Sequence, residues 1–344
     1  MRRLLAVVLV AALASVGCAS SAERAKGEAG ILRLGIFPNL THAPGYVALG
    51  EGIFDEVLAP TKVETTIFNS GTDAGEALLG GSIDATYIGP GPATSLFLQS
   101  EGGVSVVSGA VSGGASFVVH KDSGIDGPED LPGKKIAVPG FGNTQDIALR
   151  AWLEENGLKT NDEGGDVQVL EVDNPELPAL FEAGQVDGAW EPEPYPSLLV
   201  GQGTAEVYID EADLWPDGQF VTTHLLVSNI FAEEHPDLIK KLVDANVQAI
   251  QLLNEDPDAA KATAQAELIK AGAPSLDQAV VDAAWEKLTF TWDPIASSLS
   301  VGAERSFGLG YIEENPSNIL DLYRLDDLNA ILAELGESPV EVTA

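Results

Sequence analysis

Short apolar runs alternate with helical patterns along most of this chain, and this alternation constrains the fold more than any other feature. The runs "ILRLGIF", "VETTIF" and "IDATYI" are separated by segments with helical patterning, and "VSVVSGAV" and "ASFVVH" follow them. After the polar loop "KDSGIDGPEDLPGKK" the alternation begins again at "KKIAVPGF". This order is typical of parallel sheets covered by helices. The sequence therefore predicts two α/β lobes.

A corner that occurs twice supports two lobes of one plan. The stretches "GSIDATYIGPGPA" (81–93) and "GQVDGAWEPEPYP" (184–196) share a glycine, a β-branched residue, an aspartate, an aromatic residue and a proline-containing tail, in that order. One constant offset aligns Gly81 with Gly184 and Tyr87 with Trp190. A chain of 344 residues that is 45% hydrophobic can bury a core in each of two domains. We interpret the two stretches as equivalent strand ends that face one cleft.

The chain is expected to cross between the lobes twice. One crossing falls near 113–117 and the other near 222–226, after which the pattern becomes mainly helical, with a long helix starting at Pro236. We predict that lobe 1 is discontinuous, with residues 31–114 and 225–344, and that lobe 2 comprises residues 115–224. The ligand site is expected in the groove between the lobes, because open α/β sheets bind ligands at the carboxyl ends of their strands.

The N-terminus has the pattern of a targeting segment. Arg2 and Arg3 precede an apolar run, residues 4–14, that is too short to span a bilayer, so residues 1–17 are predicted to be a signal peptide. Cys18 is the only cysteine and follows Gly17, as in the lipobox of bacterial lipoproteins. We therefore predict that Cys18 is lipidated, that residues 18–30 form a flexible tether, and that the protein is extracytoplasmic and anchored to the membrane. The alternative is ordinary secretion, with the signal peptide cleaved after the run of small residues "SSA" (20–22).

The charge of the chain limits its partners. It carries 53 acidic and 18 basic residues, a formal charge of −35. A surface this acidic repels phosphate backbones, so we expect no nucleic-acid partner. Solubility or adaptation to salt explains the acidity without a cationic partner.

The loops that follow the predicted strands are rich in small hydrogen-bonding groups. They are "FPNLTH" after the first strand, "FNSGTD" after the second, "GPGP" after the third, "SGGAS" at the first crossing and "GFGNTQ" before a helix. Backbone N–H groups at a helix start favour an anion, and glycine permits its close approach. These loops predict an anion site built from neutral donors. His224 is expected near the same cleft.

No residue pattern predicts a cofactor, a metal site or a catalytic set. The four histidines lack zinc-ligand spacing, and no GxSxG motif is present. Glu191 and Glu193 in "WEPEP" could form a paired-carboxylate acid/base site, but the flanking prolines favour a rigid corner. We therefore expect binding without catalysis, and an extracytoplasmic enzyme using these two carboxylates is the alternative from another class.

Several stretches together resemble the solute-binding proteins of ABC importers for aliphatic sulfonates, taurine and nitrate. They include "THAPGYVALGEGIF", "ALLGGSIDATYIGPGPA", "GKKIAVPGFGNTQDIALRAWLEENGL" and "LFEAGQVDGAWEPEP", at ordered spacing. The resemblance implies a type II periplasmic-binding fold, α/β with two lobes, two crossover strands and a C-terminal helical return. It implies a sulfonate-like ligand, an ABC permease as partner and a monomer. The residues it places at the ligand are Asn39, His42, Asn69, Ser70, Gly71, Gly89, Pro90, Gly114, Ala115, Asn143, Thr144, Gln145, Trp190 and Glu191.

Two departures from the family pattern bear on the ligand. No arginine occupies these loops, so a sulfonate would depend on neutral donors, and Glu191 with Glu193 would suit a zwitterion such as taurine. The leading hypothesis is capture of an aliphatic sulfonate or taurine by hinge closure and delivery to a permease. Alternatives within transport are nitrate, or a pyrimidine or other aromatic precursor stacked on Trp190 and Tyr87. A sensory module that presents its ligand to a receptor is a further alternative.

Overall fold

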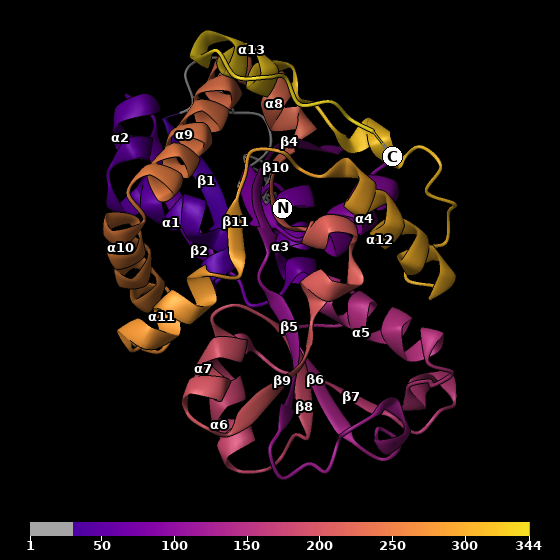
Figure 1. The fold of residues 1–344 in the computed structure, drawn as a ribbon. Coiled ribbons are helices and arrows are strands. Elements are labelled where there is room, and N and C mark those ends of the chain that lie inside the picture. The colour runs from indigo at the N-terminus through magenta and orange to yellow at the C-terminus, as the bar shows by residue number, and fades with distance from the viewer. Residues whose placement is uncertain (1–29, 344) are drawn as a thin grey trace, which may run out of the picture.

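The computed structural model describes residues 30–343 and has two lobes, one above the other in Figure 1. The upper lobe holds a six-stranded sheet in the order β11-β4-β10-β3-β1-β2. Its strands are β1 (Ile31–Ile36), β2 (Lys62–Ile67), β3 (Ala85–Ile88), β4 (Val104–Gly113), β10 (Val221–Ser228) and β11 (Leu288–Phe290). Strand β1 is parallel to β2 and β3, whereas β10 is antiparallel to β3 and β4 and β11 is antiparallel to β4. The sheet is mixed, and the expected parallel arrangement applies only to β1, β2 and β3.

The lower lobe holds a five-stranded sheet in the order β7-β6-β8-β5-β9. Its strands are β5 (Ala115–His120), β6 (Lys135–Val138), β7 (Gln168–Glu171), β8 (Gly188–Pro192) and β9 (Ala205–Asp210). Strand β6 is parallel to β7 and β8, and β5 is antiparallel to β8 and β9. The doubled corner of the sequence thus forms β3 in the upper sheet and β8 in the lower sheet.

Helices cover both sheets. Those between or after the strands of the upper sheet are α1 (Ala43–Gly50), α2 (Ile53–Val57), α3 (Gly71–Leu79), α4 (Pro90–Gln99), α8 (Asn229–Glu234), α9 (Pro236–Glu255), α10 (Pro257–Lys270), α11 (Gln278–Trp285), α12 (Ala296–Gly308) and α13 (Asp326–Leu335). The lower lobe has α5 (Thr144–Glu155), α6 (Leu177–Glu182) and α7 (Tyr195–Gly201). Two helices of the C-terminal return contact the lower lobe, α11 through α7 and α12 through α5.

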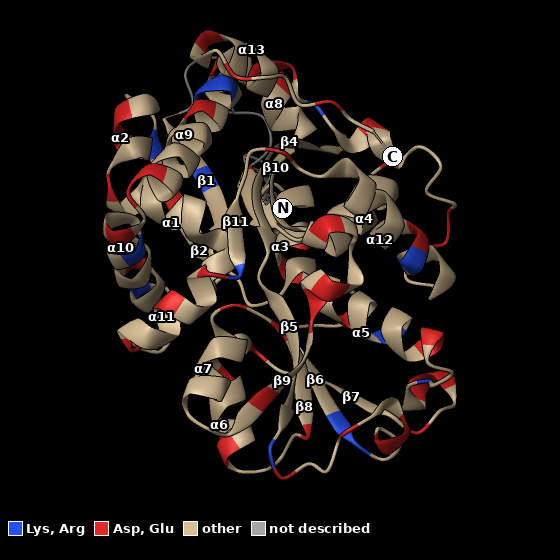
Figure 2. Cartoon of the chain, in the orientation of Figure 1, with Lys and Arg blue, Asp and Glu red and all other residues tan. Residues whose placement is uncertain are grey.

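The long helix α9 shows how the helical pattern builds the core. Ile239, Leu242, Val243, Val247 and Ile250 recur at helical spacing, and all five are fully buried in the largest apolar cluster of the upper lobe. Each side of the lower sheet has an apolar cluster of its own. Acidic residues, coloured red on the ribbon of Figure 2, are spread over the outer helices and loops of both lobes. This distribution fits the formal charge of −35.

The chain passes between the sheets twice. It leaves the upper sheet through Gly113 and Gly114, which have positive φ angles of 76° and 74° that glycine adopts readily. It returns through residues 211–220, because β10 begins at Val221. The predicted return near 222–226 is therefore wrong by a few residues, since that stretch already pairs with β4. We propose that the second lobe boundary lies before Val221.

The predicted signal peptide, Cys18 and the tether up to residue 29 lie outside the described residues. Among residues 30–343, no helix is both long and apolar enough to cross a membrane.

Candidate functional site between the lobes

Three helices begin at one cleft between the lobes. The cleft has a volume of about 410 Å³ including its opening, and its walls include Gly71 at the start of α3, Gly89 before α4 and Thr144 at the start of α5. The first two helices belong to the upper lobe and α5 belongs to the lower lobe. Because the first N–H groups of a helix lack partners within it and lie at its positive end, this cleft is suited to an anion.

The residues before these helices explain why each helix starts at the cleft. Ser70 precedes α3 in an extended conformation, and its Oγ accepts a hydrogen bond from the Thr72 N–H at 3.2 Å. Gly89 precedes α4, whose first residue is Pro90, and Asn143 precedes α5. The sequence loops "FNSG", "GPGP" and "GFGNTQ" therefore set the positions of all three helix starts.

The two lobes touch across the cleft. The Gly71 N–H donates to Asn143 Oδ1 at 3.2 Å, and the Gly91 N–H donates to Thr144 Oγ1 at 3.3 Å. The lobes are also close at Gly89, where an added Cβ would lie 2.4 Å from Thr144 Oγ1 and would have to displace that side chain. The structure thus shows a closed arrangement in which lower-lobe side chains contact upper-lobe helix starts.

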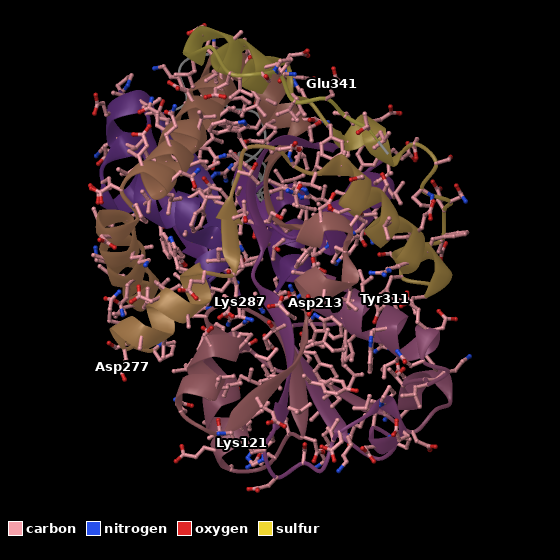
Figure 3. All side chains as sticks on the ribbon, viewed as in Figure 1. Lys121, Asp213, Asp277, Lys287, Tyr311 and Glu341 are labelled. Atoms are coloured by element: carbon pink, nitrogen blue, oxygen red, sulfur yellow. The ribbon has the colours of Figure 1, made fainter. Side chains whose placement is uncertain are left out.

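Further contacts between the lobes lie around the cleft. Asn69 Nδ2 donates to Asp173 Oδ2 at 3.0 Å, and Lys287 Nζ lies 2.8 Å from Asp210 Oδ2. Tyr311 lies shortly after α12, and its hydroxyl donates a hydrogen bond to Asp146 in α5. Figure 3 labels Lys287 and Tyr311, which lie at the junction of the two lobes. Opening the cleft would break these polar contacts together.

His42 is a neutral hydrogen-bond donor in the wall of the cleft. Its Nδ1 accepts from the Phe37 N–H at 3.3 Å, so the ring proton is on Nε2. Burial lowers the pKa of His42 to about 3. The ring therefore stays uncharged at neutral pH and does not supply a cation to the site.

Most of the predicted polar residues do line the cleft. The structure brings together Asn39, His42, Asn69, Gly71, Gly89, Asn143, Thr144 and Gln145. None of the described residues in its walls carries a charged side chain, and no three described His, Cys, Asp or Glu side chains gather where they could hold a metal ion. An anion here would be held by neutral donors and helix ends.

Trp190 and Glu191 do not form the predicted wall. Trp190 is fully buried, stacks on Phe117 with ring centroids 5.5 Å apart, and donates through Nε1 to Glu211 at 2.7 Å. Glu191 is also fully buried and reaches the cleft only through Asn174, whose Nδ2 donates to Glu191 Oε2 at 3.1 Å. Both side chains are packed within the lower lobe, so the prediction that they close the cleft is wrong.

Glu191 and Glu193 have separate partners. Among residues 30–343, Glu191 Oε1 has no hydrogen-bond partner, and burial raises the pKa of Glu191 well above its ordinary value. The carboxylate of Glu193 accepts from the Ser197 N–H at 3.2 Å and from the Ser197 hydroxyl at 3.0 Å. The arrangement is that of a rigid corner, and the two groups do not share a ligand in the cleft.

The remaining predicted residues lie beside the cleft. Ser70 caps α3, and Pro90 lines a neighbouring cavity. The Gly114 carbonyl accepts from the Glu193 N–H at 2.8 Å, and Ala115 pairs with Pro192 at the start of β5. His224 is buried behind the cleft, with Nε2 3.3 Å from the Pro294 carbonyl oxygen. Burial lowers the pKa of His224 to about 4.

Asn174 also lines the cleft, although it was not among the residues predicted to contact the ligand. It follows β7 in "VDNPE", as Asn69 follows β2 in "IFNSG". The parallel position of the two asparagines was the signal that could have identified it. Thr222 and Thr223, in β10 directly after the return crossing, also line the cleft.

Two α/β lobes joined by two crossings, with a cleft at the starts of three helices, define a protein of the type II periplasmic-binding class. The model of the NMT1-like family matches residues 25–269, and the chain belongs to that family. This confirms the resemblance and the fold expected from the sequence.

Relatives with descriptive names share part of the chain. A protein of Brucella abortus (strain 2308) named as a binding protein is 31% identical over 203 residues, which cover 57% of this chain and 58% of the relative. The taurine-binding periplasmic protein of Escherichia coli (strain K12) is 29% identical over 216 residues, 62% of this chain and 64% of the relative. The chain thus spans less than two thirds of the length of these relatives.

A solved structure agrees over more of the chain. The alkanesulfonate-binding protein of Xanthomonas axonopodis pv. citri, bound to MOPS, superposes with a TM-score of 0.69 at 22% identity, covering 83% of this chain and 93% of that one. At this identity the likeness establishes the fold.

Proposed function

We propose that this protein is the solute-binding component of an ABC importer and that it captures a small sulfonate-type anion between its lobes. The observation that carries the proposal is the meeting of three helix starts at a cleft whose described walls bear no charged side chain. A sulfonate is an anion with three acceptor oxygens and no proton to donate at neutral pH, so helix N–H groups and neutral side-chain donors suit it. The sulfonate- and taurine-binding names of the relatives point to the same ligand class.

The physiological setting belongs to the same proposal. The protein works outside the cytoplasmic membrane as a monomer, is anchored through lipidated Cys18, and delivers its ligand to a membrane permease without transforming it. Closure of the lobes over the ligand is the binding step. A Cys18→Ala variant should leave the membrane fraction for the medium, and unchanged membrane retention would contradict the anchor.

The burial of Trp190 and Tyr87 and the contact between Glu191 and Asn174 change the support for the alternative ligands. Trp190 and Tyr87 are both fully buried and neither lines the cleft, so stacking of a pyrimidine or other aromatic precursor on them loses its support. Taurine loses the direct contact between its ammonium and Glu191, because Asn174 intervenes. Nitrate stays a candidate, since it also accepts hydrogen bonds from neutral donors.

Calorimetric titration of the purified protein with methanesulfonate, taurine and nitrate tests the proposal. We expect saturable binding of methanesulfonate and a rise in melting temperature with its concentration. Asn143→Ala removes a wall side chain and should weaken binding by about tenfold, the loss for one hydrogen bond to an ion. Asn156→Ala, at the far end of the same helix, is the matched control and should bind normally. If no sulfonate binds, the proposed function is wrong.

A further inference from the structure

A second cavity lies beside the cleft and differs from it in chemistry. It has a volume of about 380 Å³ including its opening to solvent, and is bounded by α4, α5, α12 and the return crossing. Its walls are mainly apolar, with Pro90, Ile147, Ala148, Phe220 and Val221 among them. Two lower-lobe elements and two upper-lobe helices contribute, so this cavity, like the cleft, lies between the lobes.

The polar groups of the second cavity already have partners. Glu211 is buried and accepts hydrogen bonds from the indole N–H groups of Trp190 at 2.7 Å and Trp215 at 3.4 Å. The Arg305 guanidinium lies 5.0 Å from the centre of the Trp215 ring, on which it is stacked as a cation–π pair. The walls therefore offer a ligand mainly apolar surface, together with N–H groups of Arg305, which donates a hydrogen bond to Glu155 at 3.4 Å.

A contact between Thr144 and Gly91 lies where the cleft and the second cavity meet. Thr144 lines both, and its Oγ1 accepts from the Gly91 N–H across the lobe junction. A Cβ on Gly91 would lie 2.9 Å from Ile147 Cδ1, so the start of α4 packs directly on α5 here. Because the two sides of this contact belong to different lobes, it exists only when the lobes are closed.

We propose that the second cavity receives the organic group of the sulfonate, while the sulfonate head lies in the cleft at Thr144. This inference rests on the proposed function and narrows the substrate class to sulfonates that carry an uncharged aryl or branched alkyl group. A ligand that enters the open groove lies across this contact, and its oxygens accept from the Gly91 N–H and the Thr144 hydroxyl in place of their mutual hydrogen bond. Nitrate and methanesulfonate would leave the second cavity empty.

Calorimetry with benzenesulfonate and methanesulfonate tests this assignment. Burial of the ring in an apolar cavity should make benzenesulfonate bind at least about tenfold more tightly. Gly302→Leu should reduce that ratio toward one. Gly302 lines the cavity in the middle of α12, and a Cβ there meets no atom within 4 Å. Leucine is also the better helix former, so the variant should fold, which its melting temperature will show.

Gly308→Leu is the matched control. Gly308 ends the same helix, is exposed, and also has open space at its Cβ, but it does not line the cavity. The control should keep the ratio of the unaltered protein. If methanesulfonate binds but benzenesulfonate is no tighter, or if Gly302→Leu leaves the ratio unchanged, the second cavity does not hold the organic group and the proposed function stands. If neither sulfonate binds, both proposals fail.

Discussion

Replacing Glu193 by glutamine should change the pH dependence of stability. The free energy of unfolding of the variant, measured relative to that of the unaltered protein, should be larger at pH 8 than at pH 5. Glu193 is fully buried at the corner after β8. Burial, only partly offset by the hydrogen bonds from Ser197, raises the pKa of Glu193 from 4.5 to about 7. Glutamine is a matched substitute, because its amide oxygen can accept from the Ser197 N–H while its NH₂ group donates to the Ser197 hydroxyl.

The sign of the effect follows from proton binding. Between pH 4.5 and about 7 the folded protein keeps a proton on Glu193 that the unfolded chain has released. The contribution of Glu193 to stability is therefore full below pH 4.5, decreases as the pH rises through this window, and is lost above about 7. The difference between the two pKa values corresponds to about 3 kcal/mol. The glutamine side chain has no proton to lose, so the Glu193→Gln variant should lack this part of the pH dependence.

Urea denaturation followed by circular dichroism at pH 5 and pH 8 measures the effect. We expect the free energy of unfolding of Glu193→Gln, relative to the unaltered protein, to rise by about 2–3 kcal/mol between the two pH values. Glu206→Gln is the control, because Glu206 is exposed on β9 of the same lobe. Its curve should run parallel to that of the unaltered protein. A constant difference between Glu193→Gln and the unaltered protein at both pH values would refute the reasoning.

Three further substitutions test contacts at and near the cleft. Tyr311→Phe removes the hydrogen bond to Asp146 that joins the lobes, and should weaken sulfonate binding by about tenfold. Tyr323→Phe is the control, because it removes a buried hydroxyl that has no partner among the described residues, and it should bind normally. Equal affinities of the two variants in calorimetry would contradict this. Ser70→Ala removes the cap of α3 and should cost about 1 kcal/mol in urea denaturation, and an unchanged midpoint would argue against the cap. Arg150→Leu leaves the buried Asp146 without its cation, 2.8 Å away, and should cost about 3–5 kcal/mol, seen as a lower melting temperature that adding Asp146→Leu partly restores.

The cleft was largely predictable because its residues are specified locally. Glycine, proline and capping residues at strand ends fix where helices start, and in an α/β sheet these starts gather at one edge. The stretch "GFGNTQ" predicted a helix start that favours an anion, and the family resemblance then placed Asn143, Thr144 and Gln145 at the ligand; all three line the cleft. The repeat of the corner at β3 and β8 likewise indicated two lobes before any contact was known.

Other parts of the site depend on packing that no local pattern shows. An aromatic residue near a strand end can face a cleft or a core, and Trp190 faces the core because Phe117 and Glu211 lie on its side of the sheet. The second cavity forms where α12 packs against α4 and α5, although α12 is far from both in sequence. Residues 296–308 were expected only as part of a general helical return, so their role at a cavity could not be read from the sequence.

The position of β10 has a consequence for how the chain assembles as it is synthesised. All strands of the lower sheet come from one continuous stretch, residues 115–210, so that lobe can form as soon as this stretch is available. The upper sheet cannot, because β10 lies between β3 and β4 and is made more than a hundred residues after them. Until then β3 and β4 have unpaired edges on the sides where β10 will join them, and such edges can pair with other chains. The first lobe to begin is therefore the last to finish, and the edges of β3 and β4 can pair wrongly until residues 221–228 join them.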